Sequence, residues 1–346
     1  MTPACEQSAR LAWIDLLRGL AVVGMIETHV INAVLDARYD EAVWLGKLMS
    51  WDGLIAPLFL FIAGYAQGLA IQKAHAAGRD VLNASRIRRL ALIFAIAYAI
   101  HLPWGLWIKG DFGPETWRIL FQADILQCMA VSLFTIAVVG HVAGCRHLLL
   151  TGALAGLAIF LAPAAMHWHS GVGAIDAYLN RNSGSLFPLF PWFGFAACGC
   201  LASHWASDST TRKAAWLALG GIGILISPYI SPTPWFSQHP SFFFERLGWL
   251  LIFCVIAQGV ASRFSPRWLM LASRESLLLY VLHLQFIYAL PLNGKPLNLW
   301  LGRTQSLLNT ALIFIAVLAM SMLGAWLNEK RKLRRVGNLK PTPASA

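Results

Sequence analysis

The sequence predicts an all-α integral membrane protein, a polytopic bundle of about ten transmembrane helices with both termini in the cytoplasm. Of its 346 residues, 58% are hydrophobic and only 12% are charged, which is typical of membrane proteins rather than soluble domains. The mean hydropathy is +0.60. The apolar residues form runs that approach or exceed the roughly 20 residues needed to cross a bilayer. The 15 Trp fit the aromatic belts of the two membrane interfaces.

The apolar runs are the predicted membrane spans. They cover about residues 11–34, 53–74, 87–108, 117–139, 147–166, 186–205, 213–230, 242–262, 274–291 and 305–327. With the N-terminus inside, 18 Lys and Arg fall on the inner side and seven on the outer side, which fits the positive-inside rule. The chain then divides into a cytoplasmic tail (1–10), a transmembrane domain (11–327) and a basic cytoplasmic tail (328–346).

The net charge of +11 predicts a lipid bilayer as partner and no nucleic acid. The basic residues are spread over loop ends, where they face the cytoplasm and anionic headgroups. No soluble basic domain is present in the sequence to bind a nucleic acid.

The first span carries an unusual number of ionisable groups, namely Asp15, Arg18, Glu27 and His29. Each such group in hydrocarbon costs about 2.5–3.5 kcal/mol by insertion scales. A plain membrane anchor gains nothing from bearing that cost. The first span is therefore predicted to be functional.

One face of this helix is expected to present a polar group near each membrane surface. Arg18 and His29 are eleven positions apart, which returns them to nearly the same face about 16 Å apart along the axis. Asp15 precedes Arg18 by one turn, and Asn32 follows His29 by one turn.

The first span resembles a family of membrane acyltransferases. Its run Ile14-Asp15-x-x-Arg18-Gly19-x-Ala21, followed by Met25 and His29, is similar to the opening of the bacterial relatives of heparan-α-glucosaminide N-acetyltransferase. More broadly, it resembles the multi-pass acyltransferases that include the acyltransferase 3 family. They share a basic residue, ten residues of any kind and then His, and Arg18 and His29 fit this spacing.

The second span extends the resemblance. Trp51-Asp52-Gly53 precedes a Phe- and Pro-containing run that ends at Gly64, as in the family's second helix. The heparan enzyme has a His shortly before that Trp, where this chain has Leu48, so the catalytic duty would fall to His29.

Two further segments also resemble the family. In the ninth span, Arg274-x-Ser276-Leu-x-x-Tyr280-x-x-His283 places Tyr280 and His283 one turn apart. In the fourth, Asp124-Ile-Leu-Gln127 carries a carboxylate that needs a partner inside the membrane. For His283 and for Asp124, a catalytic role and structural pairing are both open.

The resemblance implies an integral membrane acyltransferase in a bacterial-type cytoplasmic (inner) membrane. It would move an acyl group, expected to be acetyl, from cytoplasmic acetyl-CoA or another acyl-CoA to an amine or hydroxyl of a sugar, envelope glycan or small-molecule acceptor. His29 would be the general base, or it would take the acyl group itself. Its expected carboxylate partner is Asp124 or Asp52.

Arginines are the predicted binding groups for the phosphates of coenzyme A. Arg18 would bind the donor, and an ion pair with Asp15 is its structural alternative. Arg86, Arg88 and Arg89 would clamp the phosphates or serve only as positive-inside anchors.

A single polar cavity is expected to receive the acceptor. Its predicted lining is His29, Glu27, His101, Asp124 and Glu245. No metal is predicted, because His167-x-His169 has no supporting Cys or acidic residue and Cys198-x-Cys200 points to opposite sides of a helix.

Two other function classes are the alternatives to acyl transfer. A secondary transporter of a small polar or anionic solute fits the spans, buried acids and prolines, but internal repeat symmetry is missing. A membrane scaffold without chemistry leaves the buried charges unexplained.

Overall fold

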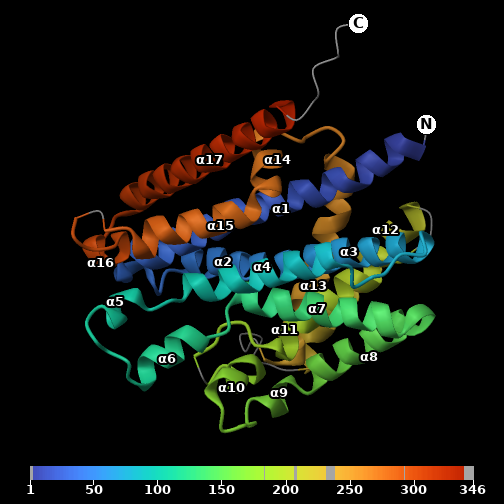
Figure 1. Cartoon of the computed structure of the whole chain (residues 1–346), viewed down its shortest axis with the longest axis horizontal. Helices are drawn as coiled ribbons and strands as arrows, with labels where there is room; N and C mark the ends of the chain where they lie inside the picture. Colours follow the sequence, from blue (N-terminus) through green and yellow to red (C-terminus); the bar gives the residue numbers. More distant parts are fainter. Residues whose placement is uncertain (1–2, 183, 206–208, 231–237, 292, 339–346) are drawn as a thin grey trace, which may run out of the picture. The chain divides into compact units, whose positions relative to one another are not determined.

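The computed structural model describes residues 3–182, 184–205, 209–230, 238–291 and 293–338 (Figure 1). Within these residues the regular structure is helical, apart from two isolated bridges. The chain divides into two compact units, which are described separately. The terminal unit contains residues 1–55 and 256–346, and the central unit contains residues 56–255.

The terminal unit is built around a long first helix. Its elements are α1 (Pro3–Val34), η1 (Ala37–Tyr39), α2 (Val43–Asp52), α14 (Arg267–Arg274), α15 (Ser276–Leu284), the π-helix η3 (Gln285–Ala289), α16 (Leu297–Leu301) and α17 (Leu307–Asn338). Helix α1 packs against α14, α15 and α17. The first span therefore lies among the last helices of the chain.

Close packing of α1 against α14 depends on Gly19. A Cβ atom at this position would lie 2.5 Å from the carbonyl oxygen of Leu269. Backbone cannot move aside as a flexible side chain can, so the glycine of the Arg18-Gly19 motif permits the approach of α14.

We expect Gly19→Val to destabilise the terminal unit by about 1–3 kcal/mol, the usual cost of overpacking. Thermal unfolding of the purified protein in lipid nanodiscs measures this. Gly46→Ala on α2 is the matched control, because a Cβ there meets nothing within 4 Å. Equal melting temperatures for the wild type and Gly19→Val would contradict the proposed close approach.

The chain after α1 is bonded to the segment that precedes α17. Asp36 N–H donates to Gln305 O at 3.0 Å, and Gln305 N–H donates to Val34 O at 2.9 Å. Arg303 Nη1 donates to Asp40 Oδ2 at 3.0 Å, and this hydrogen bond lowers the pKa of the Asp40 carboxyl. The Val34 end of α1 is thereby held in a defined position.

The central unit contains the remaining helices. They are α3 (Ile55–Ala76), α4 (Ala84–Ile100), α5 (Trp104–Trp107), α6 (Pro114–Phe121), α7 (Ile125–Val142), η2 (Gly144–Arg146), α8 (His147–Phe160), α9 (Ala162–Ala165), α10 (Gly173–Leu179), α11 (Leu189–Ser203), α12 (Ser209–Ile230) and α13 (Pro240–Val260). Helix α11 packs against α8 and α7, and α7 also packs against α4.

Each of the ten predicted spans contains helix in the described residues, but not every span is one continuous helix. The span predicted over 87–108, for example, is divided between α4 and α5. Five helical stretches are long and apolar enough to cross a membrane by themselves: Val43–Ala76, Ile125–Val142, Thr210–Ile230, Pro240–Val260 and Leu307–Arg335. Shorter apolar helices are Gly144–Phe160, Leu189–Ser203 and Ser276–Ala289. A helical membrane protein is thus supported, while the number of ten spans and the sides of the termini stay predictions.

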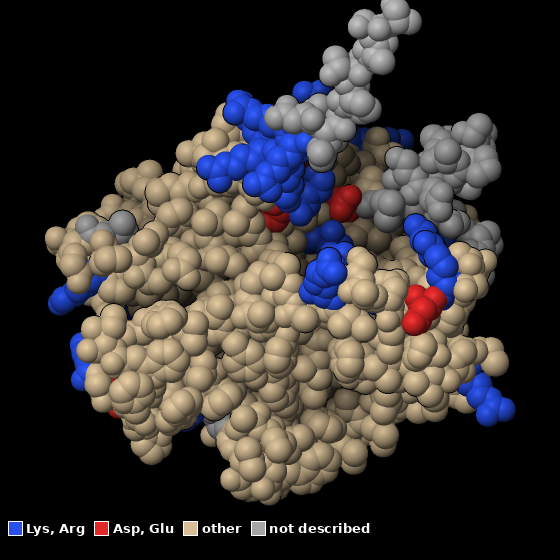
Figure 2. Space-filling view, in the orientation of Figure 1, with Lys and Arg blue, Asp and Glu red and all other residues tan. Residues whose placement is uncertain are grey.

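Helices extend into both predicted tails. Helix α1 begins at Pro3, within the predicted N-terminal tail, and α17 continues to Asn338, within the predicted C-terminal one. Residues 339–346 of that tail lie outside the described residues. Figure 2 shows basic side chains gathered near the end of α17, where the exposed residues are Lys330, Arg331, Lys332, Arg334 and Arg335.

The prediction of one continuous span over 117–139 is wrong. Helix α6 ends at Phe121, and α7 begins at Ile125. Asp124 is the N-cap of α7, and Asp124 and Gln127 form a capping box. The side chains satisfy N–H groups that a new helix start leaves free, so the backbone breaks here despite its apolar sequence.

Candidate functional site

Asp15 and Arg18 form an ion pair on α1 of the terminal unit. Arg18 Nη1 lies 3.5 Å from Asp15 Oδ1, and Ser273 Oγ of α14 donates to the same oxygen at 2.8 Å. The Arg18 side chain keeps 26% of its surface accessible. The ion pair that was the structural alternative for Arg18 is therefore present, and the side chain is still partly accessible.

His29 lies about three turns after Arg18 on nearly the same face of α1. Its ring is hydrogen-bonded to the backbone of the same helix. Its Nδ1 is 2.8 Å from the carbonyl oxygen of Met25. A carbonyl only accepts, so Nδ1 carries the proton and a neutral ring presents the lone pair at Nε2. This is the form that a proton acceptor needs.

His283 of α15 pairs with His29. The two ring centroids are 5.0 Å apart, with the rings edge to face. His283 Nδ1 donates to Leu279 O at 2.8 Å, so its lone pair is also at Nε2. The ring is fully buried, and Nε2 has no hydrogen-bond partner. Leaving a buried acceptor unpaired costs about 1–3 kcal/mol, so this atom calls for a functional explanation.

Two tyrosines flank the histidine pair. The Tyr280 ring centroid is 5.6 Å from that of His283, as their spacing on one helix face predicted. Tyr288 lies in η3, where its ring centroid is 6.1 Å from that of His29 and its hydroxyl donates to His29 O at 3.3 Å. π-Helical turns occur frequently at functional sites.

The same unit also contains two acidic residues and one amide that were predicted as site residues. Asp52 ends α2, and its Oδ2 is buried with no hydrogen-bond partner. Glu27 is half-buried and acts electrostatically on Asp52, whereas Asn32 is exposed. The Met25 carbonyl of the same helix is the partner of His29 Nδ1, so a carboxylate partner of this ring, if it has one, would have to act at Nε2 and stays a prediction.

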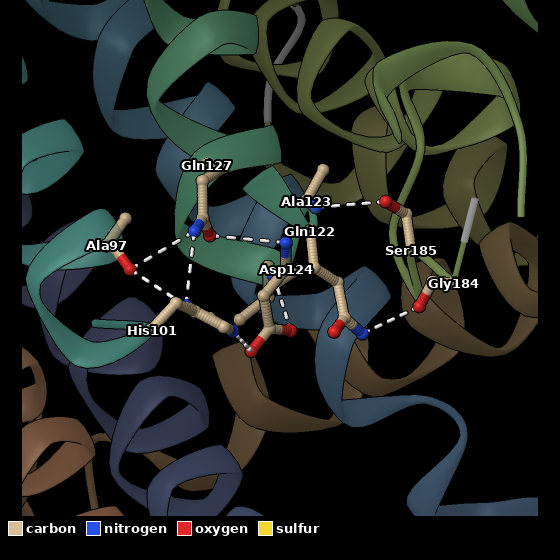
Figure 3. Close-up of polar contacts among 9 residues, drawn as sticks. Ala97, His101, Gln122, Ala123, Asp124, Gln127, Gly184 and Ser185 are labelled. Carbon is tan, nitrogen blue, oxygen red and sulfur yellow. Dashed lines mark hydrogen bonds and ion pairs between the residues drawn. The ribbon is translucent and has the colours of Figure 1, made fainter. Parts of the chain in front are cut away.

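The central unit contains a second polar cluster, which Figure 3 shows. His101 Nδ1 is 2.9 Å from Ala97 O, and Gln127 Nε2 donates to the same carbonyl at 3.1 Å. His101 Nε2 lies 3.8 Å from Asp124 Oδ2. Gln127 Oε1 accepts from the Asp124 backbone N–H at 3.2 Å. His101 is therefore the nearby side-chain partner of the Asp124 carboxylate.

The break before α7 is tied to the loop that precedes α11. The Ala123 N–H donates to Ser185 Oγ at 2.9 Å, and Gln122 Nε2 donates to Gly184 O at 2.6 Å (Figure 3). Asp124 thus has a structural task, and a catalytic role for it remains a prediction.

The three arginines predicted to clamp phosphates differ in their surroundings. Arg86 folds back on its own unit, where its guanidinium donates to Val81 O and, at 3.3 Å, to Ala70 O. Arg88 and Arg89 are exposed. Only the last two present their side chains to the surroundings.

The predicted site residues belong to two units, and each set stands by itself. The terminal unit holds Asp15, Arg18, Glu27, His29, Asn32, Asp52, Tyr280 and His283, and the central unit holds Arg86, Arg88, Arg89, His101, Asp124 and Glu245. Glu245 is half-buried on α13. The structure adds Ser273 and Tyr288. Ser273 precedes the late motif directly, while no sequence signal pointed to Tyr288.

The comparisons with known proteins identify the family of the chain. No curated protein matches the chain. The family model described as heparan-alpha-glucosaminide N-acetyltransferase, catalytic, matches residues 10–244. The match covers more than half of the chain and includes Arg18, His29 and Asp124. The motifs of the first two apolar segments and this match together show that the chain belongs to the heparan-alpha-glucosaminide N-acetyltransferase catalytic family.

Proposed function

We propose that this protein transfers an acyl group, acetyl in the first instance, from acyl-CoA to an amine or hydroxyl of a sugar or envelope glycan. Its family indicates a membrane acetyltransferase. One observation carries the finer proposal: His29, on the motif-bearing helix, pairs with buried His283, and both rings donate Nδ1–H to carbonyls. Each neutral ring therefore offers a lone pair at Nε2.

In the proposed reaction the acceptor's nitrogen or oxygen attacks the thioester carbonyl. The new C–N or C–O bond forms, the C–S bond breaks, and coenzyme A leaves as its thiolate. His29 Nε2 takes the proton that the acceptor loses and returns it to the thiolate. General-base help of this kind contributes about 10²–10⁴-fold to rate.

His283 and the tyrosines would keep the base in position. The fully buried ring of His283 packs edge-on against His29 and offers a second acceptor atom, for the N–H that an attacking amine keeps or for a neighbouring hydroxyl of a sugar. Tyr288 bonds to the backbone of His29, and Met25 fixes the ring's tautomer. Asp52, with its unpartnered oxygen, is proposed to orient an amine acceptor.

Arg18 is proposed to bind the phosphates of the donor. Guanidinium forms charge-assisted, often bidentate bonds with phosphate. Coenzyme A carries its phosphates and its thioester at opposite ends of a long arm, which suits Arg18 and His29, about 16 Å apart along a helix. Arg88 and Arg89 remain separate candidates for phosphate binding.

The proposed location follows from the helices and the charge distribution. The protein would lie in a bacterial-type cytoplasmic membrane with the Arg18 end of α1 toward the cytoplasm, where acyl-CoA is found. The acceptor would reach His29 from the opposite side.

Arg18→Gln is expected to raise the KM for acetyl-CoA about 10-fold or more, because a hydrogen bond to a charged group contributes about 1.5–3 kcal/mol. Steady-state kinetics with protein in nanodiscs measures this. Asp15→Asn is the matched control, since it breaks the same ion pair without removing the cation. If both variants raised KM equally, the pair would be only structural.

The function itself is tested by following label from acetyl-CoA. Purified protein in nanodiscs is incubated with labelled acetyl-CoA and a panel of amino sugars and glycans, and products are separated from the donor. Transfer to an acceptor supports the proposal. Solute uptake by proteoliposomes without any acyl donor, together with no transfer, would instead support a secondary transporter.

A further inference from the structure

Three histidines outside the proposed site converge at one end of the central unit. His75 lies near the end of α3, His147 begins α8, and His204 is the C-cap of α11. The ring centroids of His147 and His204 are 4.9 Å apart, and those of His75 and His147 are 5.3 Å apart. The closest approach is between the Nε2 atoms of His147 and His204, which are 3.1 Å apart.

In both His147 and His204, the second ring nitrogen, Nδ1, is already a hydrogen-bond donor. His147 Nδ1 lies 2.7 Å from Gly144 O, and a carbonyl accepts only, so this nitrogen carries a proton. His204 Nδ1 lies 3.0 Å from both Cys200 O and Ser203 Oγ. Ser203 donates its single hydroxyl proton to Cys200 O at 2.7 Å, so His204 Nδ1 must donate as well.

This assignment leaves no proton for the contact between the two Nε2 atoms. Two neutral rings protonated at Nδ1 would aim lone pairs at each other across 3.1 Å. One added proton turns the repulsion into an N–H···N hydrogen bond of ordinary length. We propose that His147 and His204 bind one proton between their Nε2 atoms and so form a pH-dependent link between the start of α8 and the end of α11.

The surroundings define when this proton is held. The ring of His147 is buried and that of His204 is half-buried, with the ring of His75 against His147, so this environment disfavours the extra charge and the proton is held only toward acid pH. Arg146 of η2 precedes His147 and adds positive charge, while His141 of α7 has its own ion pair with Asp80 at 2.9 Å. The link is therefore closed in mild acid and open above it.

His75 gives the pair a route to solvent. Its side chain is exposed while its Nε2 donates to Gly140 O at 3.0 Å, and its ring lies against that of buried His147. Within the described residues, no group of three or more His, Cys, Asp or Glu is arranged to hold a metal ion. Two ring nitrogens 3.1 Å apart can share one proton in a hydrogen bond of ordinary length.

A double-mutant cycle with the full-length protein in nanodiscs tests the link. Melting temperatures of the wild type, His147→Gln, His204→Gln and the double variant are compared at about pH 5.5 and about pH 8.5, with a chelator present. At the lower pH, the melting temperature of the double variant should fall by about 2 °C less than the sum of the falls in the two single variants. At the higher pH this favourable coupling should vanish or reverse.

His167→Gln, an exposed loop histidine, is the matched control and should show no coupling to either site at either pH. Additive losses at both pH values, or a favourable coupling larger at the higher pH, would overturn the proposal. So would a coupling that appears only after zinc is added. If a variant fails to fold, ring-¹⁵N-labelled wild type decides: the two Nε2 signals should titrate in one common step, and independent titrations would overturn the link.

Discussion

Replacing His29 by Gln is expected to lower kcat for acetyl transfer by about 10²–10⁴-fold, the usual contribution of a positioned general base. The amide has a similar size and still hydrogen-bonds, but it cannot take a proton at neutral pH. Donor binding at Arg18 does not involve this ring, so the KM for acetyl-CoA should change little.

Steady-state kinetics across pH checks this expectation. A base must be neutral to accept a proton, so the wild-type rate should fall toward acid pH, and the residual rate of His29→Gln should lose that dependence. His167→Gln, which changes an exposed histidine, is the control and should leave kcat unchanged. A His29→Gln enzyme with wild-type kcat would exclude His29 as the base.

His283→Leu is expected to lower kcat by about 10²-fold and yet to leave the protein as stable as the wild type or more so. The loss reflects removal of a preorganised acceptor close to the reacting atoms. The stability follows because leucine fills a similar volume and removes the buried, unpartnered Nε2. If His283 served only for packing, its replacement would not lower kcat while leaving the stability unchanged or higher.

Kinetics and thermal unfolding of the same nanodisc sample measure both effects. His283→Gln keeps an acceptor oxygen and should retain more activity than His283→Leu. Unchanged kcat in His283→Leu, or a loss of activity that parallels a loss of fold, would make the residue structural.

Most of the helices could be predicted from the sequence, because their apolar runs are long. The break at Asp124 was missed because a capping box needs only two polar side chains in the correct register, and hydropathy averages over them. The sequence Asp124-x-x-Gln127 contained the signal. The π-helix after His283 left no comparable pattern.

The candidate site was predictable where its residues lie on one helix. The Asp15–Arg18 pair and the Tyr280–His283 contact follow from helical spacing. The contacts of His29 with His283 and Tyr288 depend on how α1 packs against α15 and η3, which spacing does not encode. Arg86 was one of the candidates for phosphate binding, and its long side chain reaches backbone carbonyls of its own unit.

Chemical rescue of a His29→Gly variant tests most directly whether the imidazole at this position moves the proton. Transfer of label from acetyl-CoA to the acceptor is measured in nanodiscs with and without added imidazole. The proposed mechanism predicts that His29→Gly is nearly inactive and that imidazole restores a concentration-dependent part of the rate, with no such gain for His29→Gln. Wild-type transfer by His29→Gly without imidazole, or a folded and donor-binding variant that imidazole never restores, would contradict it.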